Sequence, residues 1–277
     1  MLNWGLLFQA DLTVRILFIG DIVGQPGRHI VRDRLADTIA HQRIDLVIAN
    51  CENAASGFGI TPRLVEELLA AGCEVLSGGN HTWDRREILD YFPREPRLLR
   101  PANYPPGAPG QGVYIGRTHN GISYAVLNLQ GRVFLPAIDC PFRTADEQLA
   151  RIPPEVRVVV VDMHAETTSE KLAMGWYLDG RVTAVVGTHT HVPTADERIL
   201  PRGTAYITDV GMTGPHDSVI GMDREGILGR FLDALPRRFE VAEGNVQMNT
   251  VLIEVDENAT GPAGRAPATA ISRQRID

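Results

Sequence analysis

The chain has 277 residues, which is long enough for one large α/β domain with a sizeable buried core. Hydrophobic residues make up 44% of it, charged residues 22%, and the formal net charge is −7 at pH 7. This composition is typical of a globular protein in water, and the acidic balance argues against binding to bulk nucleic acid or a membrane surface. Three widely spaced cysteines and the lack of a secretory signal favour a reducing, cytoplasmic location.

The first part of the chain alternates between apolar, strand-like runs and helical patterns. Strands are expected at 15–21, 45–51 and 74–80, with helices at 27–42 and 61–72 between them. The strands are apolar without interruption, which is typical of parallel strands covered on both faces. This part therefore predicts a parallel α/β arrangement.

The second part of the chain is less regular. A hairpin is expected at 112–131, turning at Asn120-Gly121. Further along come strands at 157–164, 182–189 and 249–256, a helix at 169–180 and a second hairpin at 197–211. We expect residues 1–13 to be an extension outside the fold, 14–258 to form a single domain, and 259–277, rich in Ala, Gly and Pro, to be a partly mobile tail.

Polar side chains follow most of the predicted strands. Asp21 closes the first, Glu52-Asn53 follow the second, Asn80-His81 close the third, His164 closes a later one, and His189 and His191 close another. Each alone is more often a cap, a turn residue or a structural histidine. Because the carboxyl ends of parallel strands open on one crevice, their joint recurrence predicts that these side chains meet in one site.

The residue types in this set point to metal binding. Carboxylate, carboxamide and imidazole ligands suit manganese, iron or zinc. There are too many candidate ligands for one tetrahedral ion and about the right number for two. Two ions ~3.5–4 Å apart can clamp a phosphate and activate a bridging water or hydroxide. Glu52 is the candidate for a carboxylate that bridges the two.

Taken in order, these motifs resemble those of the calcineurin-like metallophosphoesterases, and more closely their YmdB-like subfamily. The segments that carry the resemblance are GDIVG (20–24), ENA (52–54), GGNHTWD (78–84), GTHTHV (187–192) and YITDVGMTGP (206–215). The similarity runs from about Arg15 to about Val255. Val23 stands where the wider superfamily has a histidine, Glu52 replaces an aspartate that bridges the metals, and Thr188 alters the last motif while leaving its two histidines.

The resemblance implies an α/β fold, a metallophosphoesterase-type β-sandwich of two mixed sheets flanked by helices. It also implies a phosphodiesterase acting on cyclic nucleotides of the 2′,3′-cyclic AMP type, and self-association into a homo-oligomer. Its cofactors would be two divalent or trivalent metal ions, iron first, with manganese or zinc as alternatives. Carried over by residue, one metal would be held by Asp21, Glu52, Asn53 and His191, and the other by Glu52, Asn80, His164 and His189.

The resemblance also suggests how the reaction proceeds. A metal-bridging hydroxide would attack phosphorus, and His81 would act as the general acid that protonates the departing ribose oxygen. Asp84 would orient His81 or a ligand histidine through a hydrogen bond, with a helix cap as an equal alternative. His216, in the glycine-rich loop 212–222, would contact the substrate, against an ordinary turn as the default.

Three alternatives stay open at this stage. The same metals could serve a phosphomonoesterase. A dinuclear hydrolase of C–N or C–O bonds also uses clusters of His and Asp. A catalytically weak regulatory protein that holds a metal or nucleotide is the third, because a histidine is lacking at Val23.

Overall fold

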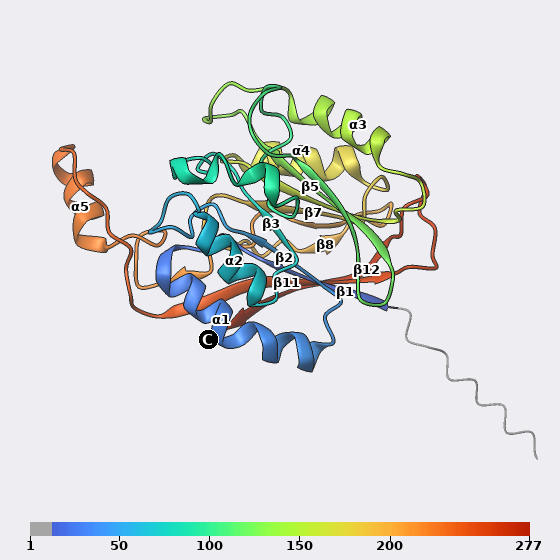
Figure 1. Ribbon diagram of the computed structural model, residues 1–277, viewed down its shortest axis with the longest axis horizontal. Helices are drawn as coiled ribbons and strands as arrows, with labels where there is room; N and C mark the ends of the chain where they lie inside the picture. The colour runs from blue at the N-terminus through green and yellow to red at the C-terminus, as the bar shows by residue number, and fades with distance from the viewer. Residues whose placement is uncertain (1–12) are drawn as a thin grey trace, which may run out of the picture.

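The computed structural model describes residues 13–277 and consists of two six-stranded sheets packed face to face between helices (Figure 1). The extension expected at 1–13 lies, apart from Thr13, outside the described residues. Within the described residues, no helix is both long and apolar enough to cross a membrane. Two mixed sheets flanked by helices were predicted, and this architecture is confirmed.

The first sheet has the strand order β10-β11-β1-β2-β3, with β12 paired to β11. Its strands are β1 (Thr13–Ile19), β2 (Leu46–Asn50), β3 (Val75–Ser77), β10 (Gly214–Pro215), β11 (Val246–Asp256) and β12 (Ala268–Ile276). β1, β2 and β3 are parallel, as the uninterrupted apolar runs predicted.

The second sheet has the order β4-β5-β6-β7-β9-β8. Its strands are β4 (Val113–Arg117), β5 (Ser123–Gln130), β6 (Val158–His164), β7 (Ala184–Thr188), β8 (Arg198–Ile199) and β9 (Ala205–Ile207). β5, β6, β7 and β9 run parallel. The two predicted hairpins are present as the antiparallel pairs β4–β5, with Gly121 at positive φ in its turn, and β8–β9.

Four helices cover the outer faces of the two sheets, and a fifth does not. The helices are α1 (Gly24–Gln42), α2 (Pro62–Ala70), α3 (Pro141–Arg151), α4 (Thr168–Leu178) and α5 (Arg224–Asp233), with short 3-10 turns at Arg86–Ile88 and Phe92–Arg94. α1 and α2 pack on the first sheet, and α3 and α4 pack on the second. α5 stands away from the body of the molecule on an arm of the chain (Figure 1).

The two sheets bury a continuous apolar core between them. In β1 the alternation of the strand sends Ile16 and Phe18 into this core, while Leu17 and Ile19 face α1 and α2. Every one of these side chains is fully buried. This packing holds the carboxyl ends of β1, β2, β6 and β7 in fixed positions relative to one another.

The C-terminal segment departs from expectation. Residues 259–277, expected as a partly mobile tail, contain β12, which pairs antiparallel with β11 along most of its length. Ala266 and Ala268 are buried in the core between the sheets. The domain boundary at 258 therefore needs correction. Small alanine side chains fit where two sheets approach closely, but they give a weak strand signal in a sequence.

Candidate metal centre

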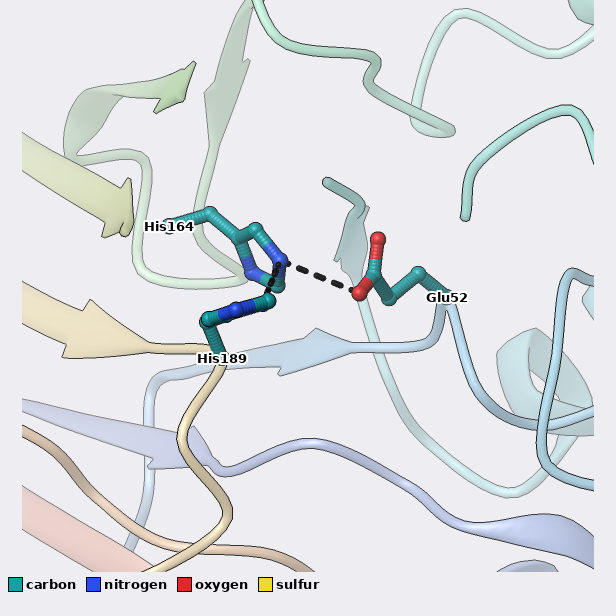
Figure 2. Close-up of side chains that lie close together, drawn as sticks. All are labelled: Glu52, His164 and His189. Carbon is teal, nitrogen blue, oxygen red and sulfur yellow. Dashed lines mark hydrogen bonds and ion pairs between the residues drawn. The ribbon is translucent and has the colours of Figure 1, made fainter. Parts of the chain in front are cut away.

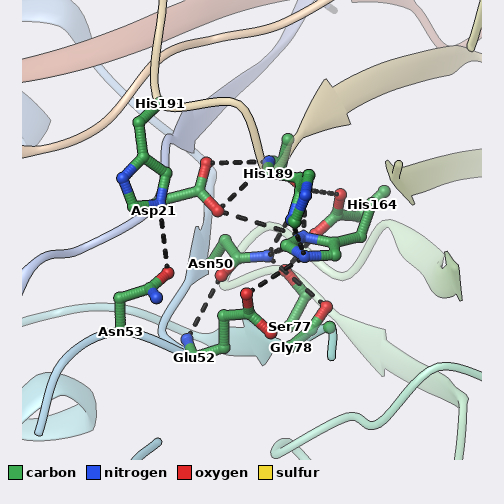
Figure 3. Close-up of polar contacts among 12 residues, drawn as sticks. Asp21, Asn50, Glu52, Asn53, Ser77, Gly78, His164, His189 and His191 are labelled. Atoms are coloured by element: carbon green, nitrogen blue, oxygen red, sulfur yellow. Dashed lines mark hydrogen bonds and ion pairs between the residues drawn. The ribbon is translucent and has the colours of Figure 1, made fainter. Parts of the chain in front are cut away.

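The candidate metal ligands meet at the carboxyl ends of the strands. Asp21 follows β1, Glu52 follows β2, His164 ends β6 and His189 follows β7. Asp21, Asn53 and His191 gather on one side of the cluster, and His164 and His189 lie on the other (Figure 3). Residues that are up to 170 positions apart in sequence thus share one buried edge, from Asp21 to His191.

His164 is the centre of the tighter group. Its Nε2 lies 3.0 Å from Glu52 Oε1, 3.0 Å from Asn80 Oδ1 and 3.0 Å from Nδ1 of His189. Figure 2 shows the imidazoles of His164 and His189 and the carboxylate of Glu52 directed toward one another. Their ligand atoms all lie within 4.8 Å of one another. Since metal–nitrogen and metal–oxygen bonds are about 2.0–2.2 Å long, donor atoms this close can share one ion.

The second group is looser. His191 Nε2 lies 3.3 Å from Asn53 Oδ1, and the buried carboxylate of Asp21 is beside the His191 ring (Figure 3). Asp21 accepts the backbone N–H of His189 at 3.2 and 3.3 Å. The two groups together offer two carboxylates, two carboxamides and three imidazoles, and no thiolate. This set of donors fits iron, manganese or zinc.

The histidine pair at 189 and 191 is held in an unusual backbone conformation. Both residues have positive φ, 100° for His189 and 64° for His191, a region that non-glycine residues seldom adopt. In an extended chain, side chains two residues apart point to the same side, and the positive φ values change where the two imidazoles point. As a result His189 joins the group around His164, whereas His191 joins Asn53.

Burial and the neighbouring charges shift the pKa values of the cluster. Burial raises the pKa of Asp21 above its usual value. Burial alone would raise that of Glu52 as well, but the charge and hydrogen bond of His164 hold it at about 2. Burial would lower the pKa of His164, yet the carboxylates of Glu52 and Asp21 raise it to about 9. The same carboxylates would stabilise a bound cation.

His81 lies at the mouth of this cluster. Its backbone N–H donates to Glu52 Oε2 at 2.9 Å, and its Nδ1 lies 2.7 Å from Asp84 Oδ2. The Asp84 contact is the one expected if that residue orients His81. The alternative role for Asp84 was a helix cap. The turn nearby begins at Arg86, its capping position is Arg85, and no side chain makes a capping hydrogen bond there.

Comparison with known proteins agrees with the motifs. The model of the family described as YmdB-like protein matches residues 17–264. The chain belongs to the YmdB-like family. Its relatives include the 2′,3′-cyclic-nucleotide 2′-phosphodiesterase of Bacillus subtilis (strain 168), 52% identical over 244 residues, which are 88% of this chain and 92% of that protein.

Two solved structures have the same fold as this YmdB-like chain. One is a protein from Thermus thermophilus, with a TM-score of 0.86 and 42% identity over 95% of this chain and 99% of the other. The second is a novel phosphatase from Mycoplasma pneumoniae, with a TM-score of 0.87 and 36% identity over 95% of this chain and 93% of the other. The predicted family and the metallophosphoesterase-type fold are confirmed.

One predicted residue of the YmdB-like chain lies apart from the cluster. His216 lines a different pocket, where its Nε2 is 3.2 Å from Asn249 Nδ2 and 3.3 Å from the carbonyl oxygen of Met212. The loop 212–222 does reach the pocket beside the metal cluster, but through Ile220 and Met222.

Sequence reasoning missed a buried layer of polar side chains beneath the candidate ligands. Asp162 accepts hydrogen bonds from Ser77 Oγ at 2.5 Å, Thr188 Oγ1 at 2.7 Å and Asn50 Nδ2 at 3.2 Å. Thr188 Oγ1 lies 2.9 Å from His164 Nδ1, so this layer orients the imidazole. A signal was present, since Asp162 interrupts the otherwise apolar run VVVVDM of β6.

Proposed function

We propose that the chain is a metal-dependent phosphoric diester hydrolase that acts on cyclic nucleotides of the 2′,3′-cyclic AMP type. The observation that carries the proposal is the convergence of Glu52, Asn80 and His189 on His164 Nε2, with His81 beside it. The name of the Bacillus subtilis relative supports the cyclic nucleotide as substrate. The proposed partner is a small phosphate ester, not bulk nucleic acid or a membrane.

The metals belong to the proposal. One would be held by Asp21, Glu52, Asn53 and His191, and the other by Glu52, Asn80, His164 and His189. Iron is the proposed metal, with manganese or zinc as alternatives. When bound, the two ions would supply positive charge to the phosphate oxygens and activate the attacking water or hydroxide.

His81 supplies the proton in this proposal. Because Nδ1 faces Asp84, Nε2 is the nitrogen left for the substrate. As the oxygen of water adds to phosphorus and one water proton passes to solvent, the bond from phosphorus to one ribose oxygen breaks. Nε2–H of His81 protonates that oxygen, and His81 then takes up a proton from solvent. The product is a nucleoside monophosphate with a free ribose hydroxyl.

The test combines metal analysis with a turnover screen over cyclic nucleotides and phosphomonoesters. We expect bound transition metal and hydrolysis of 2′,3′-cyclic AMP. His81→Ala should lower kcat by ~10²–10⁴ while keeping the metal. The exposed His41 gives the control His41→Ala, which should keep full activity.

Three results would contradict the proposal. Hydrolysis of monoesters alone would make the chain a phosphomonoesterase. Binding of a cyclic nucleotide without turnover would make it a regulatory protein. A His81→Ala variant that loses its metal or keeps full activity would remove the general-acid role.

A homo-oligomer in the cytoplasm is the proposed form of the protein. Large apolar side chains on and after α5 are exposed, among them Phe231 at 82% and Leu232 at 87%, and self-association would cover them. Light scattering on purified protein measures the mass directly, and a monomer at micromolar concentration would contradict this form.

A further inference from the structure

The pocket beside the metal cluster is lined by side chains of two kinds. Its volume is 340 Å³. The polar lining residues include Glu52, Asn53, His81, Glu166, His189 and His191. The apolar lining residues, which we call the apolar wall, are Phe58, Ile220, Met222, Ile227 and Phe239. A phosphate group needs only the polar side chains, so the apolar wall calls for a second, uncharged part of the ligand.

The apolar wall is held by backbone hydrogen bonds. Val219 and Met222 form a bridge, Met222 pairs with Val241, and Ala242 N–H donates to the carbonyl oxygen of Gly221 at 3.0 Å. These bonds close the base of the arm that carries α5. Phe239 is stacked against the guanidinium of Arg230, whose Cζ lies 5.2 Å from the ring centroid. The wall is therefore part of the folded structure.

Ile220 joins the apolar wall to the metal cluster. Its carbonyl oxygen lies 2.9 Å from Nδ1 of His191, and its side chain lines the pocket. Its φ is 47°, a left-handed conformation that β-branched residues rarely adopt, and its side chain is 51% exposed. Strain of this kind persists where function requires a particular side chain. A glycine or asparagine would fit this backbone more easily.

We propose that the apolar wall is the nucleobase subsite of this enzyme. The inference rests on the proposed function, since it assumes that the phosphate lies against the metal cluster. Flat nucleobases stack on aromatic and apolar side chains, and every base offers such a face. The five side chains of the wall carry no hydrogen-bond donor and no acceptor stronger than the Met222 thioether, so the wall holds a base without reading its edge. The site accepts 2′,3′-cyclic nucleotides of all four bases and favours the larger purines.

The experiment compares two cyclic phosphodiesters, one that carries a nucleobase and one that does not. Metal-loaded wild type and Phe239→Ala are assayed with 2′,3′-cyclic AMP and with glycerol 1,2-cyclic phosphate, which has no base. We expect Phe239→Ala to raise KM for 2′,3′-cyclic AMP by about 10-fold, with little change in kcat and none in the kinetics of the glycerol ester. Trp176→Ala, an exposed aromatic residue on α4 that does not line the pocket, is the matched control.

Ile220→Asn separates a role in binding from a role in folding. Asparagine tolerates positive φ, so Tm should stay the same or rise. KM for 2′,3′-cyclic AMP should nevertheless rise selectively, as in Phe239→Ala. A substitution that acted only through the fold would instead lower Tm and impair both substrates alike.

The outcomes are distinct. Unchanged KM for 2′,3′-cyclic AMP in both variants, or equal losses on both esters, would overturn the subsite. Calorimetric titration with 2′,3′-cyclic AMP keeps the test valid without turnover. If wild type binds it but does not hydrolyse it, the proposed function fails, and the variants' Kd values decide the subsite. If wild type neither binds nor hydrolyses it, both proposals fail.

Discussion

Nζ of Lys171 lies 2.6 Å from Oδ2 of Asp209, and both side chains are fully buried beneath the loop that carries His189 and His191. The same carboxylate accepts the backbone N–H of Thr190 at 3.1 Å and its hydroxyl at 2.7 Å. Thr190 stands between the two histidines, so this ion pair fixes the strained segment from below. Lys171 comes from α4 and Asp209 follows β9.

Removing the cation of this pair should destabilise the protein strongly. Lys171→Met leaves the Asp209 carboxylate buried and unpaired, so we expect the free energy of unfolding to fall by about 3–5 kcal/mol. Denaturant unfolding measures this. In the double variant Lys171→Met/Asp209→Asn the orphan charge is gone, and part of the loss should be recovered. A single variant as stable as wild type would show that the pair does not hold the loop.

The glycine before Asn80 should be irreplaceable. A Cβ added at Gly79 would overlap the imidazole ring of His164. Gly79→Ala should therefore displace a candidate metal ligand, lower metal content and reduce turnover at least about 10-fold. Gly226→Ala in α5 is the control, since its Cβ would meet its nearest neighbour at 3.7 Å and should cost no stability. Normal metal content and turnover in Gly79→Ala would contradict this.

The contact between Asp84 and His81 yields a milder prediction. Asp84→Asn keeps the size of the side chain but removes the charge that orients His81 Nδ1, so we expect kcat to fall by about 10-fold with metal content unchanged. The matched control is Asp90→Asn at an exposed position a few residues on. Should both variants retain the wild-type kcat, Asp84 would have no part in orienting His81.

Removal of metal should affect stability as well as turnover. A metal site assembled from distant residues would bind its cation only in the folded state, so at a free metal concentration 100 times Kd the ion should add about 2.7 kcal/mol to the free energy of unfolding. Chelation should lower Tm and abolish turnover, and adding back iron, manganese or zinc should restore both. Elemental analysis should find two ions per chain. Protein verified to lack metal, yet with unchanged Tm and activity, would exclude a metal centre here.

Local features of the sequence were sufficient for much of the fold. Apolar runs predicted the parallel strands β1, β2 and β3, because burial on both faces leaves an uninterrupted apolar pattern. The helix expected at 61–72 is α2, and at its start the Thr61 side chain accepts from the Leu64 N–H, with Pro62 at the first helical position. The polar residues at the strand ends were found in the same way, since the carboxyl ends of parallel strands share an edge.

Only the tertiary structure decided which of these residues meet and what surrounds them. β12 pairs with β11, His216 turns to another pocket, and Lys171 reaches Asp209. Five apolar side chains from separate parts of the chain line one pocket. The sequence by itself determined many of the strands and helices and indicated the candidate ligands, because periodicity and caps act over a few residues. It could not determine the partners, because a buried strand or side chain has the same pattern whichever distant neighbour it packs against.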